Sequence, residues 1–252
     1  MTTAIAIVQA RVTSTRFPGK VLADLAGRPM VLQQLSRLAD AQTLSSIVVA
    51  TSDDESDDVL ASVVSDAGFP VVRGSLNDVL GRFVLAMDLH PSEFVVRITA
   101  DCPMLMPDVV DDVVTRMLVG DADYVSNTLE PTFPDGVDVE AVRSSVLRQV
   151  ASMSRDSAER EHVTLGVYRR SDQYRVAHVK GDRDLSDLRW TVDTPEDLAF
   201  VREIYTRLGS GFAMRDVLAL LAKEPELSRT QSHGRRNAAL DGLDTGAMKH
   251  RQ

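Results

Sequence analysis

Residues 11–20 gather two arginines, small hydroxyl side chains, a glycine and a lysine within ten positions. Backbone N–H groups, hydroxyls and fixed cations can surround a polyphosphate, and Gly19 would let the backbone approach it closely. Arginine can also bind phosphate oxygens through two N–H groups at once. The GxxxxGK[ST] pattern of the Walker A loop is absent. The segment therefore predicts either an anion-binding loop of another type or a solvated basic loop.

Polar side chains follow four predicted strands, and their positions predict where a ligand binds. The clusters lie at residues 9–20, 51–54, 73–82 and 99–103. The expected strands lie at 4–8, 46–50, 69–72 and 94–98. Helices are expected at 29–41 and 55–67, and two more should begin near residue 78 and at Pro107. Ser75 or Asn77 is the expected N-cap of the helix that begins near residue 78. Such alternation is typical of an α/β fold with a mostly parallel, doubly wound sheet. Because ligands bind beyond the carboxyl ends of such strands, the four clusters should meet at one rim.

The alternation changes after Asn127. We expect a turn at 132–140 running into a strand, helices at 144–153 and 156–170, strands at 122–126, 174–179 and 188–192, and helices from Pro195 and at 212–222. Thr194 as N-cap with Pro195 at the first helical position is a strong helix start. Residues 1–227 are predicted to form one domain, and the polar residues 228–252 a flexible tail.

Composition narrows the class of protein. A chain of 252 residues with 44% hydrophobic residues can build one α/β domain with a sizeable core. Its net charge of −9 argues against non-specific nucleic-acid binding. The single cysteine, Cys102, excludes an intrachain disulfide and a cysteine-based zinc cluster. With no signal peptide evident and no apolar run of about 20 residues, we expect a cytoplasmic enzyme without a membrane segment.

The sequence QARVTSTRFPGK at residues 9–20, followed by LAGRPM at 25–30, resembles the start of the sugar-nucleotide cytidylyltransferases. Those enzymes include the synthases that activate 3-deoxy-octulosonate and neuraminate-type acids as CMP-sugars. The resemblance covers residues 4–207 in ordered patches and is closest to the spore-coat-polysaccharide cytidylyltransferase-like branch. It implies a three-layer, Rossmann-like nucleotidyltransferase fold and Mg²⁺-dependent transfer of CMP from CTP to an acidic sugar or similar hydroxylated acid, with release of pyrophosphate. It also implies a homodimer, with residues 127–185 as the acceptor and dimerisation part.

The resemblance assigns the magnesium ion to two aspartates at predicted strand ends, Asp101 in TADCP and Asp193 in TVDTP. Magnesium takes one or two carboxylates together with phosphate oxygens and water. Without the resemblance, Asp101 reads equally well as a loop cap before Pro103. Asp193 then reads as an acid placed ahead of a helix start, where acids are favoured.

The nucleotide is assigned by similarity to the two loop segments. The implied contacts are Gln9, Ala10, Arg11, Ser14, Arg16, Gly19, Lys20, Arg73, Asp78 and Arg82. Arg11 and Lys20 would hold phosphates, whereas Arg16 could instead meet the acid group of the acceptor. The segment from Arg73 to Arg82 would border the base, where a carboxylate can accept from the amino group of cytosine. The alternatives are ordinary surface cations, helix capping by Asp78 and a solvated Arg82.

The acceptor is expected to meet two further groups of residues. Asp135, Asp138 and Glu140 could bind its hydroxyl or amino groups or assist a second metal ion, or else form a turn and a solvated strand face. Glu161 and His162 form the second group. His162 could contact the acceptor carboxylate or deprotonate its attacking hydroxyl, although a lone histidine is as often structural.

The chain departs from the octulosonate enzymes at Thr99 and Ala100, where those enzymes have Gln and Gly. The resemblance therefore supports CMP transfer without identifying the acceptor. Two other classes remain open. A nucleotide-sugar-dependent glycosyltransferase of similar fold would need an Asp-x-Asp-like metal motif, for which residues 53–54 and 121–123 are the nearest candidates. A non-catalytic nucleotide-binding protein is the other. Cys102 is expected to be structural rather than a nucleophile.

Overall fold

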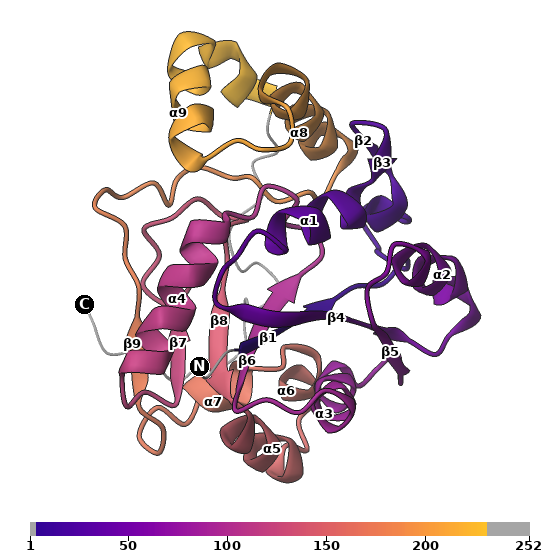
Figure 1. The fold of residues 1–252 in the computed structure, drawn as a ribbon, viewed down its shortest axis with the longest axis vertical. Coiled ribbons are helices and arrows are strands. Elements are labelled where there is room, and N and C mark those ends of the chain that lie inside the picture. Colours follow the sequence, from indigo (N-terminus) through magenta and orange to yellow (C-terminus); the bar gives the residue numbers. More distant parts are fainter. Residues whose placement is uncertain (1–3, 231–252) are drawn as a thin grey trace.

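A central mixed sheet covered by helices on both faces forms the body of the protein, which a computed structural model describes for residues 4–230 (Figure 1). In this range the sheet has seven strands in the order β5-β4-β1-β6-β8-β7-β9. Their bounds are β5 (Val71–Gly74), β4 (Leu44–Ser52), β1 (Ala4–Gln9), β6 (Phe94–Thr99), β8 (Glu140–Arg143), β7 (Tyr124–Ser126) and β9 (Val176–His178). The three-layer, mostly parallel fold predicted from the sequence is confirmed.

Strand β1 lies at the point where the chain order reverses. It pairs in parallel with β4 on one side and with β6 on the other. The chain first runs outward through β4 to β5 and then returns across β1 to form β6. In such sheets a crevice opens beyond the carboxyl ends of the two strands at the reversal. The four parallel strands therefore bring their following loops to one edge, as the sequence predicted.

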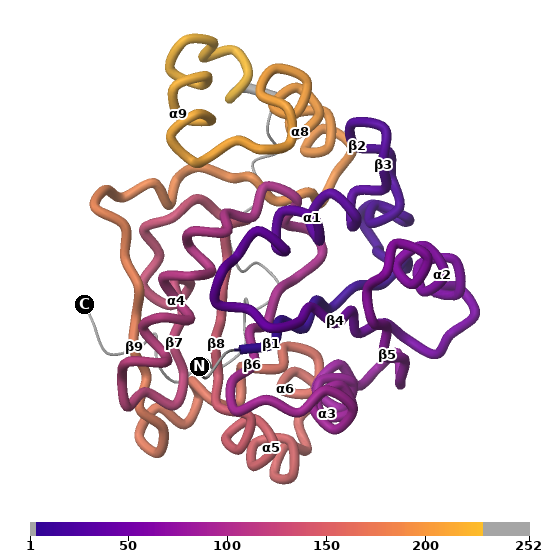
Figure 2. Tube along the Cα trace, in the orientation of Figure 1, coloured from indigo at the N-terminus to yellow at the C-terminus, as the bar shows by residue number. Residues whose placement is uncertain are grey.

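The helices divide into two groups that bury the two faces of the sheet (Figure 2). The first group is α1 (Met30–Leu38), α2 (Asp58–Asp66), α4 (Pro107–Val119), α8 (Pro195–Leu208) and α9 (Met214–Lys223). The second is α3 (Val79–Leu89), α5 (Ser144–Met153), α6 (Ser157–Glu161) and α7 (Leu165–Tyr168). Alternate β1 residues enter the two cores, Val8 in one and Ile7 in the other. Burial on both faces explains the apolar run of this strand.

Short elements complete the fold. A two-stranded hairpin, β2 (Asp24–Leu25) and β3 (Arg28–Pro29), precedes α1, and 3₁₀ turns lie at Lys20–Leu22, Glu55–Asp57 and Pro225–Thr230. Thr194 and Asp197 form the reciprocal capping box at the start of α8. The start of α3 is capped by Asp78, which accepts from the Gly81 N–H, rather than by Ser75 or Asn77. The predicted tail lies outside the described residues from position 231 onward.

Two predicted elements are wrong. Residues 156–170 do not form one helix, because the chain turns between α6 and α7 at Val163, whose φ is 47°. Val163 is fully buried, so its apolar character fits this turn as well as it would fit a helix. Residues 188–192 are not a sheet strand either. Their backbone bonds to two loops, with Trp190 N–H donating to the Asp135 carbonyl at 2.6 Å and Val192 N–H to the Asp101 carbonyl at 2.8 Å.

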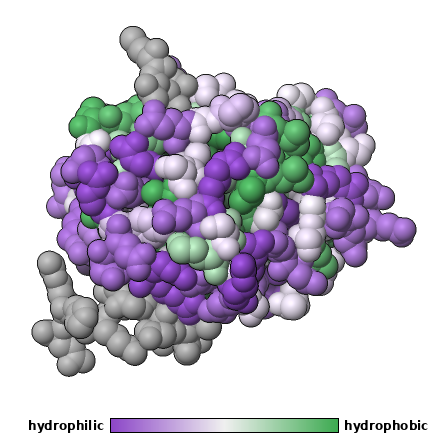
Figure 3. All heavy atoms as spheres, turned by 90° about the horizontal axis from the view of Figure 1, so that it is seen from below, coloured by the Kyte–Doolittle hydropathy of each residue, from purple (hydrophilic) through white to green (hydrophobic). Residues whose placement is uncertain are grey.

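The surface seen in Figure 3 is mostly hydrophilic, with small apolar groups between polar ones. Large apolar side chains with substantial exposure in the described part of the chain are Val59, Leu85, Leu89, Val119 and Met153. None of the helices in residues 4–230 is long and apolar enough to cross a membrane.

Candidate active site

The loop after β1 is fastened to the neighbouring strand by one buried carboxylate. Asp57 is fully buried and accepts hydrogen bonds from the backbone N–H groups of Val12, at 2.7 Å, and Ser52, at 3.1 Å. The loop then closes on itself, because the Gly19 N–H donates to the Val12 carbonyl at 2.9 Å. Gly19 has a φ of 75°, a left-handed conformation that favours glycine. The loop is thus held at the carboxyl edge of the sheet.

A cavity of about 490 Å³ opens beside this loop, at the carboxyl ends of β1 and β6. It brings together many of the residues predicted to form the site. It is lined by Gln9, Ala10, Arg11, Ser14, Thr15, Arg16, Lys20, Val21, Thr99, Ala100, Asp101, Glu161 and Asp193. Residues 9–21 near the start of the chain and Asp193 near its end therefore meet at the predicted crevice.

Lys20 joins the two predicted metal-binding aspartates through its ammonium group. Its Nζ lies 3.0 Å from Asp193 Oδ1 and 3.3 Å from Asp101 Oδ2, and it donates to the Val192 carbonyl at 2.8 Å. Asp193 has two further cationic partners, Arg16 at 3.0 Å and Arg189 at 2.7 Å. The cavity floor is consequently a compact cluster of alternating charges.

The mutual attraction of these charges fixes their protonation states. Burial alone would lower the pKa of Lys20, but the carboxylates of Asp101 and Asp193 outweigh it and raise that pKa above its usual value. Burial alone would raise the pKa of Asp101, but Lys20 and hydrogen bonds outweigh it and lower that pKa. Asp101 is therefore ionised and Lys20 protonated at neutral pH.

The donor set suits Mg²⁺ bound together with a substrate phosphate. Asp101 and Asp193 already converge on one cationic nitrogen, and Asp101 keeps 30% of its side chain exposed. Two carboxylates plus phosphate oxygens and water are a common magnesium environment. Within residues 4–230 no group of three or more His, Cys, Asp or Glu side chains could hold a metal ion. A metal ion in this cavity would therefore take its remaining ligands from substrate and water.

Arg73, Asp78 and Arg82, predicted to border the base, do not line the cavity. Arg73 donates to the carbonyls of Ser52 and Asp54 and pairs with Asp58 at 2.7 Å. Asp78 caps α3 and pairs with Arg160 of α6. Arg82 is only 3% exposed and is therefore not solvated, and its Nε and Nη1 have no hydrogen-bond partner within residues 4–230.

The acids predicted to meet the acceptor are largely neutralised within the protein. Asp135 pairs with Arg189 at 2.7 Å. Glu140 pairs with Arg97 and accepts from the hydroxyls of Tyr124, at 2.5 Å, and Thr164, at 2.6 Å. Both carboxylates are buried, so neither forms the solvated face that was the alternative prediction.

Cys102 follows the cavity residue Asp101 and is itself buried. Cys102 is 1% exposed, and its pKa is raised by burial and then by the charges of Asp101 and Asp138. A buried thiol with a raised pKa is a poor nucleophile. This agrees with the structural role expected for Cys102. Asp138 is not among the residues that line the cavity.

Glu161 and His162 differ in position although they are adjacent. Glu161 lines the cavity and lies 4.0 Å from Arg11. His162 is half-buried at the end of α6 and is not among the lining residues. Burial lowers the pKa of His162 below its usual 6.5, so the imidazole is neutral at pH 7.

The carboxylates considered for a glycosyltransferase metal motif have other partners. Asp54 accepts from Ser56 at the start of a 3₁₀ turn. Asp121 and Asp123 both pair with Arg175, at 3.0 and 3.2 Å. None of them lines the cavity. The structure therefore gives no support to that alternative.

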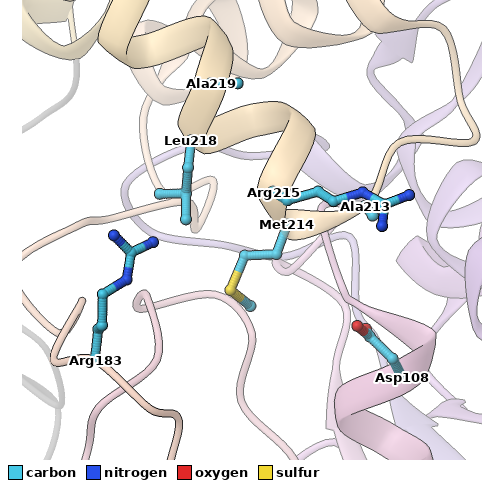
Figure 4. Close-up of a pocket in the computed structure, with 7 residues that line it drawn as sticks. All are labelled: Asp108, Arg183, Ala213, Met214, Arg215, Leu218 and Ala219. Carbon is cyan, nitrogen blue, oxygen red and sulfur yellow. The ribbon is translucent and has the colours of Figure 1, made fainter.

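A second hollow lies beside α9, away from the predicted residues (Figure 4). It measures about 570 Å³, and Met214 and Leu218 project into it. Its remaining lining residues are Asp108, Arg183, Ala213, Arg215 and Ala219. Arg183 and Arg215 are both exposed to solvent. The hollow lacks the paired carboxylates and buried lysine of the first cavity.

The sequence reasoning missed three residues that organise the cavity: Asp57, Arg97 and Arg189. Arg97 interrupts the apolar run FVVRI of β6, and a charge within a buried strand is a signal that could have found it. Arg189 stands four positions before Asp193, with which it pairs. Asp57 lies in an acidic stretch, and its sequence position alone carries no signal that its side chain turns inward.

The fold and the site together define an α/β protein with an anion-binding loop and paired carboxylates at the chain-reversal crevice. A solved cytidylyltransferase from Leptospira borgpetersenii superposes with a TM-score of 0.87 at 28% identity, covering 93% of this chain and all of that one. The family profile described as cytidylyltransferase matches residues 5–216. The chain belongs to the cytidylyltransferase family.

Two proteins that carry functional names are similar to this chain. The spore coat polysaccharide biosynthesis protein SpsF of Bacillus subtilis is 29% identical over 229 residues, covering 87% of this chain and 94% of SpsF. The 3-deoxy-manno-octulosonate cytidylyltransferase of Geobacter sulfurreducens is 38% identical over 114 residues, covering 44% of each chain. The resemblance expected from the sequence is confirmed.

Proposed function

We propose that the protein transfers CMP from CTP to an oxygen of an acidic sugar, or of a similar hydroxylated acid, in the presence of Mg²⁺. An acceptor hydroxyl would give up its proton to a base, and its oxygen would form a bond to the α-phosphorus as the bond to the pyrophosphate oxygen breaks and pyrophosphate leaves. The observation that carries the proposal is the cluster of Lys20, Asp101 and Asp193 on the floor of a cavity rimmed by loop arginines. The polysaccharide and octulosonate designations of the two relatives support a sugar-acid acceptor.

The loop cations would bind and orient the triphosphate. Arg11 and Arg16 are about half-exposed at the cavity, so N–H groups beyond those that face Glu161 and Asp193 can reach phosphate oxygens. Arg16 could also receive the acid group of the acceptor. Lys20 lies deeper, beside both carboxylates, and would neutralise charge close to the reacting phosphorus. When bound, Mg²⁺ would supply additional positive charge to the phosphate oxygens.

Pyrophosphate release is the experiment that tests this function. The purified protein is incubated with Mg²⁺, each of the four ribonucleoside triphosphates and a panel of sugar acids and phosphonates. We expect release with CTP and one class of acceptor. Replacing Asp101→Asn should lower kcat by about a hundredfold or more, because it removes one charge from the metal-binding pair.

Asp121→Asn is the matched control, because Asp121 is 82% exposed and pairs only with surface Arg175 among the contacts resolved for it. Its kcat should equal that of the wild-type protein. Release of a nucleoside diphosphate from a sugar donor, or equal activity of both variants, would contradict the proposed function. Binding of CTP without pyrophosphate release across a broad acceptor panel would favour a non-catalytic protein.

A further inference from the structure

Arg97, in the middle of β6, joins the cavity to the buried interior through two hydrogen bonds. Its Nε donates to Gln9 Oε1 at 2.9 Å, and its Nη1 pairs with the Glu140 carboxylate. The Arg97 side chain is 15% exposed and that of Glu140 is 8% exposed, so both charges are largely shielded from water. Gln9, by contrast, lines the cavity at the end of β1. Arg97 therefore lies behind the cavity wall.

The contact with Arg97 settles how the Gln9 carboxamide is turned. A guanidinium group has five N–H donors and no acceptor. Only the amide oxygen of Gln9 can therefore face it, and the reverse orientation would set two donors against each other. The NH₂ group of Gln9 is left on the side away from Arg97. The O and NH₂ groups of the Gln9 carboxamide are similar in shape, but the contact with Arg97 means that the NH₂ group, a hydrogen-bond donor, faces the cavity.

Arg97 is itself held in a single orientation. The Glu140 carboxylate that binds it also accepts from the Tyr124 and Thr164 hydroxyls at 2.5 and 2.6 Å. These partners come from β7 and from the start of α7. The Tyr124 and Thr164 hydroxyls hold the Glu140 carboxylate in place. If the Arg97 side chain rotated, the guanidinium group and this carboxylate would both be left buried without a charged partner. The orientation of Gln9 is consequently imposed by elements outside the cavity.

The position of Gln9 places its donor among the groups that would surround a bound substrate. Gln9 pairs in register with Thr99 across β1 and β6, and both residues line the cavity together with Arg11 and Asp101. We propose that Arg97 is a positioning residue that turns the Gln9 carboxamide so that its NH₂ group donates a hydrogen bond to an oxygen of the bound substrate. The inference rests on the proposed function. The oxygen belongs either to the nucleotide or to the acceptor acid.

Two substitutions at Gln9 distinguish the hydrogen bond donated by its NH₂ group from the space that its side chain fills. Gln9→Met keeps the length of the side chain and removes both polar groups. Gln9→Glu keeps an acceptor for Arg97 but presents a carboxylate oxygen to the cavity in place of the NH₂ group. Loss of a hydrogen bond to a charged group corresponds to a roughly tenfold to hundredfold fall in kcat/KM, which we expect for Gln9→Met. Gln9→Glu should lose more, because a carboxylate repels a substrate oxyanion.

The separate kinetic constants identify the oxygen. A higher KM for CTP assigns it to the nucleotide, a higher KM for the acceptor assigns it to the acid, and a lower kcat alone assigns it to the reacting phosphate in the transition state. Any of these three results supports the inference. Wild-type constants in both Gln9 variants would overturn it.

A double-substitution cycle tests whether Arg97 acts through Gln9. Arg97→Lys retains a cation for Glu140 but loses the fixed geometry of the guanidinium fork. If Arg97 positions Gln9, this substitution should lower kcat/KM in the wild-type background and have little further effect in the Gln9→Met background. An equal effect in both backgrounds would mean that Arg97 is only structural. Arg148→Lys, the same substitution at a surface arginine that pairs with Asp88, is the control and should leave kcat/KM close to the wild-type value.

Calorimetric titration with Mg²⁺ and CTP, run on the same proteins, separates failure of the inference from failure of the proposed function. If the wild-type protein neither binds CTP nor releases pyrophosphate, both the proposed function and this inference are wrong. If the wild-type protein does both and the Gln9 variants have the same CTP affinity and kinetic constants, only this inference is wrong.

Discussion

Within residues 4–230, Lys20 is the one cation that contacts both aspartates on the cavity floor, which makes Lys20→Met an informative perturbation. The substitution keeps most of the buried aliphatic length and removes the ammonium group. Asp101 then loses the only partner of opposite charge recorded for it in the described residues. Asp193 keeps Arg16 at 3.0 Å and Arg189 at 2.7 Å. The loss in free energy of unfolding should therefore come mainly from the Asp101 carboxylate, which is left without a charged partner.

The size of the effect follows from burial. Removing one partner of a fully buried ion pair costs about 3–5 kcal/mol. Asp101 is 30% exposed, so solvent screens part of its charge, and Asp193 remains neutralised. We expect a loss of about 2 kcal/mol in the free energy of unfolding at pH 7, equivalent to a fall of about 4–8 °C in Tm for a domain of this size.

The pH dependence of this loss has a definite sign. The folded-state pKa of Asp101 is lowered, so its contribution to stability is present above the unfolded pKa of about 4 and is lost as the pH falls through the folded value. The pKa of Lys20 is raised, so its contribution persists up to about pH 10 and is lost above that. The difference between wild type and Lys20→Met should therefore be constant from pH 5 to 9 and shrink below pH 4.

Thermal unfolding with and without Mg²⁺ provides the assay. With the ammonium removed, a divalent cation can take its place between the two carboxylates, so Mg²⁺ should raise the Tm of Lys20→Met more than that of the wild-type protein. Lys180→Met is the matched control, because Lys180 is 51% exposed and forms a surface pair with Glu130. Equal Tm values for the two variants, or an equal response of all three proteins to Mg²⁺, would refute the reasoning.

Three further predictions concern residues at the margin of the cavity and the assembly of the protein. Arg82→Met should raise the free energy of unfolding by about 1 kcal/mol, because it removes a buried charge with two nitrogens that have no hydrogen-bond partner among the described residues. It should also weaken CTP binding, because the family resemblance places Arg82 beside the base. Destabilisation with unchanged CTP affinity would contradict this. Because burial lowers the pKa of His162 below its usual 6.5, a role as base predicts that kcat/KM falls only at a pH lower than for an ordinary histidine. His162→Gln should abolish that fall. A rise in activity on acidification would instead indicate that protonated His162 binds the acceptor carboxylate. Light scattering at micromolar concentration should give the mass of a homodimer formed through residues 127–185, and a monomeric mass would rule it out.

The sequence predicted the position of the site because that position depends on local and repeated features. An apolar run marks β1, a polar loop follows it, and parallel strands must end at the same edge of the sheet. Residues 11–20 and 99–103 could therefore be placed together although about 80 residues separate Lys20 from Asp101. The paired aspartates needed the family resemblance as well, since an acid ahead of a helix is common.

Partners distant in the sequence account for what the sequence could not show. Residues 188–192 have the composition of a strand, but their backbone groups bond to loops, and no local signal reveals the absence of a neighbouring strand. The break at Val163 was hidden for a similar reason, because a buried apolar residue suits a helix and a turn equally. Glu140 was predicted to meet the acceptor or to lie on a solvated strand face, because nothing near it in the sequence reveals that its partner is Arg97, 43 positions earlier.

Two arginines explain why Asp135 and Glu140 are buried rather than open to substrate. Arg97 bridges Gln9 of the cavity and one of these carboxylates, and Arg189 bridges Asp193 of the cavity and another. Buried ion pairs of this kind seldom exceed well-packed apolar side chains in stability, so stability alone does not account for them. Each arginine instead fixes the orientation of one cavity residue from outside the cavity. We therefore expect the segment 135–140 to influence acceptor binding through Gln9 and Asp193, without touching the acceptor at its two buried carboxylates.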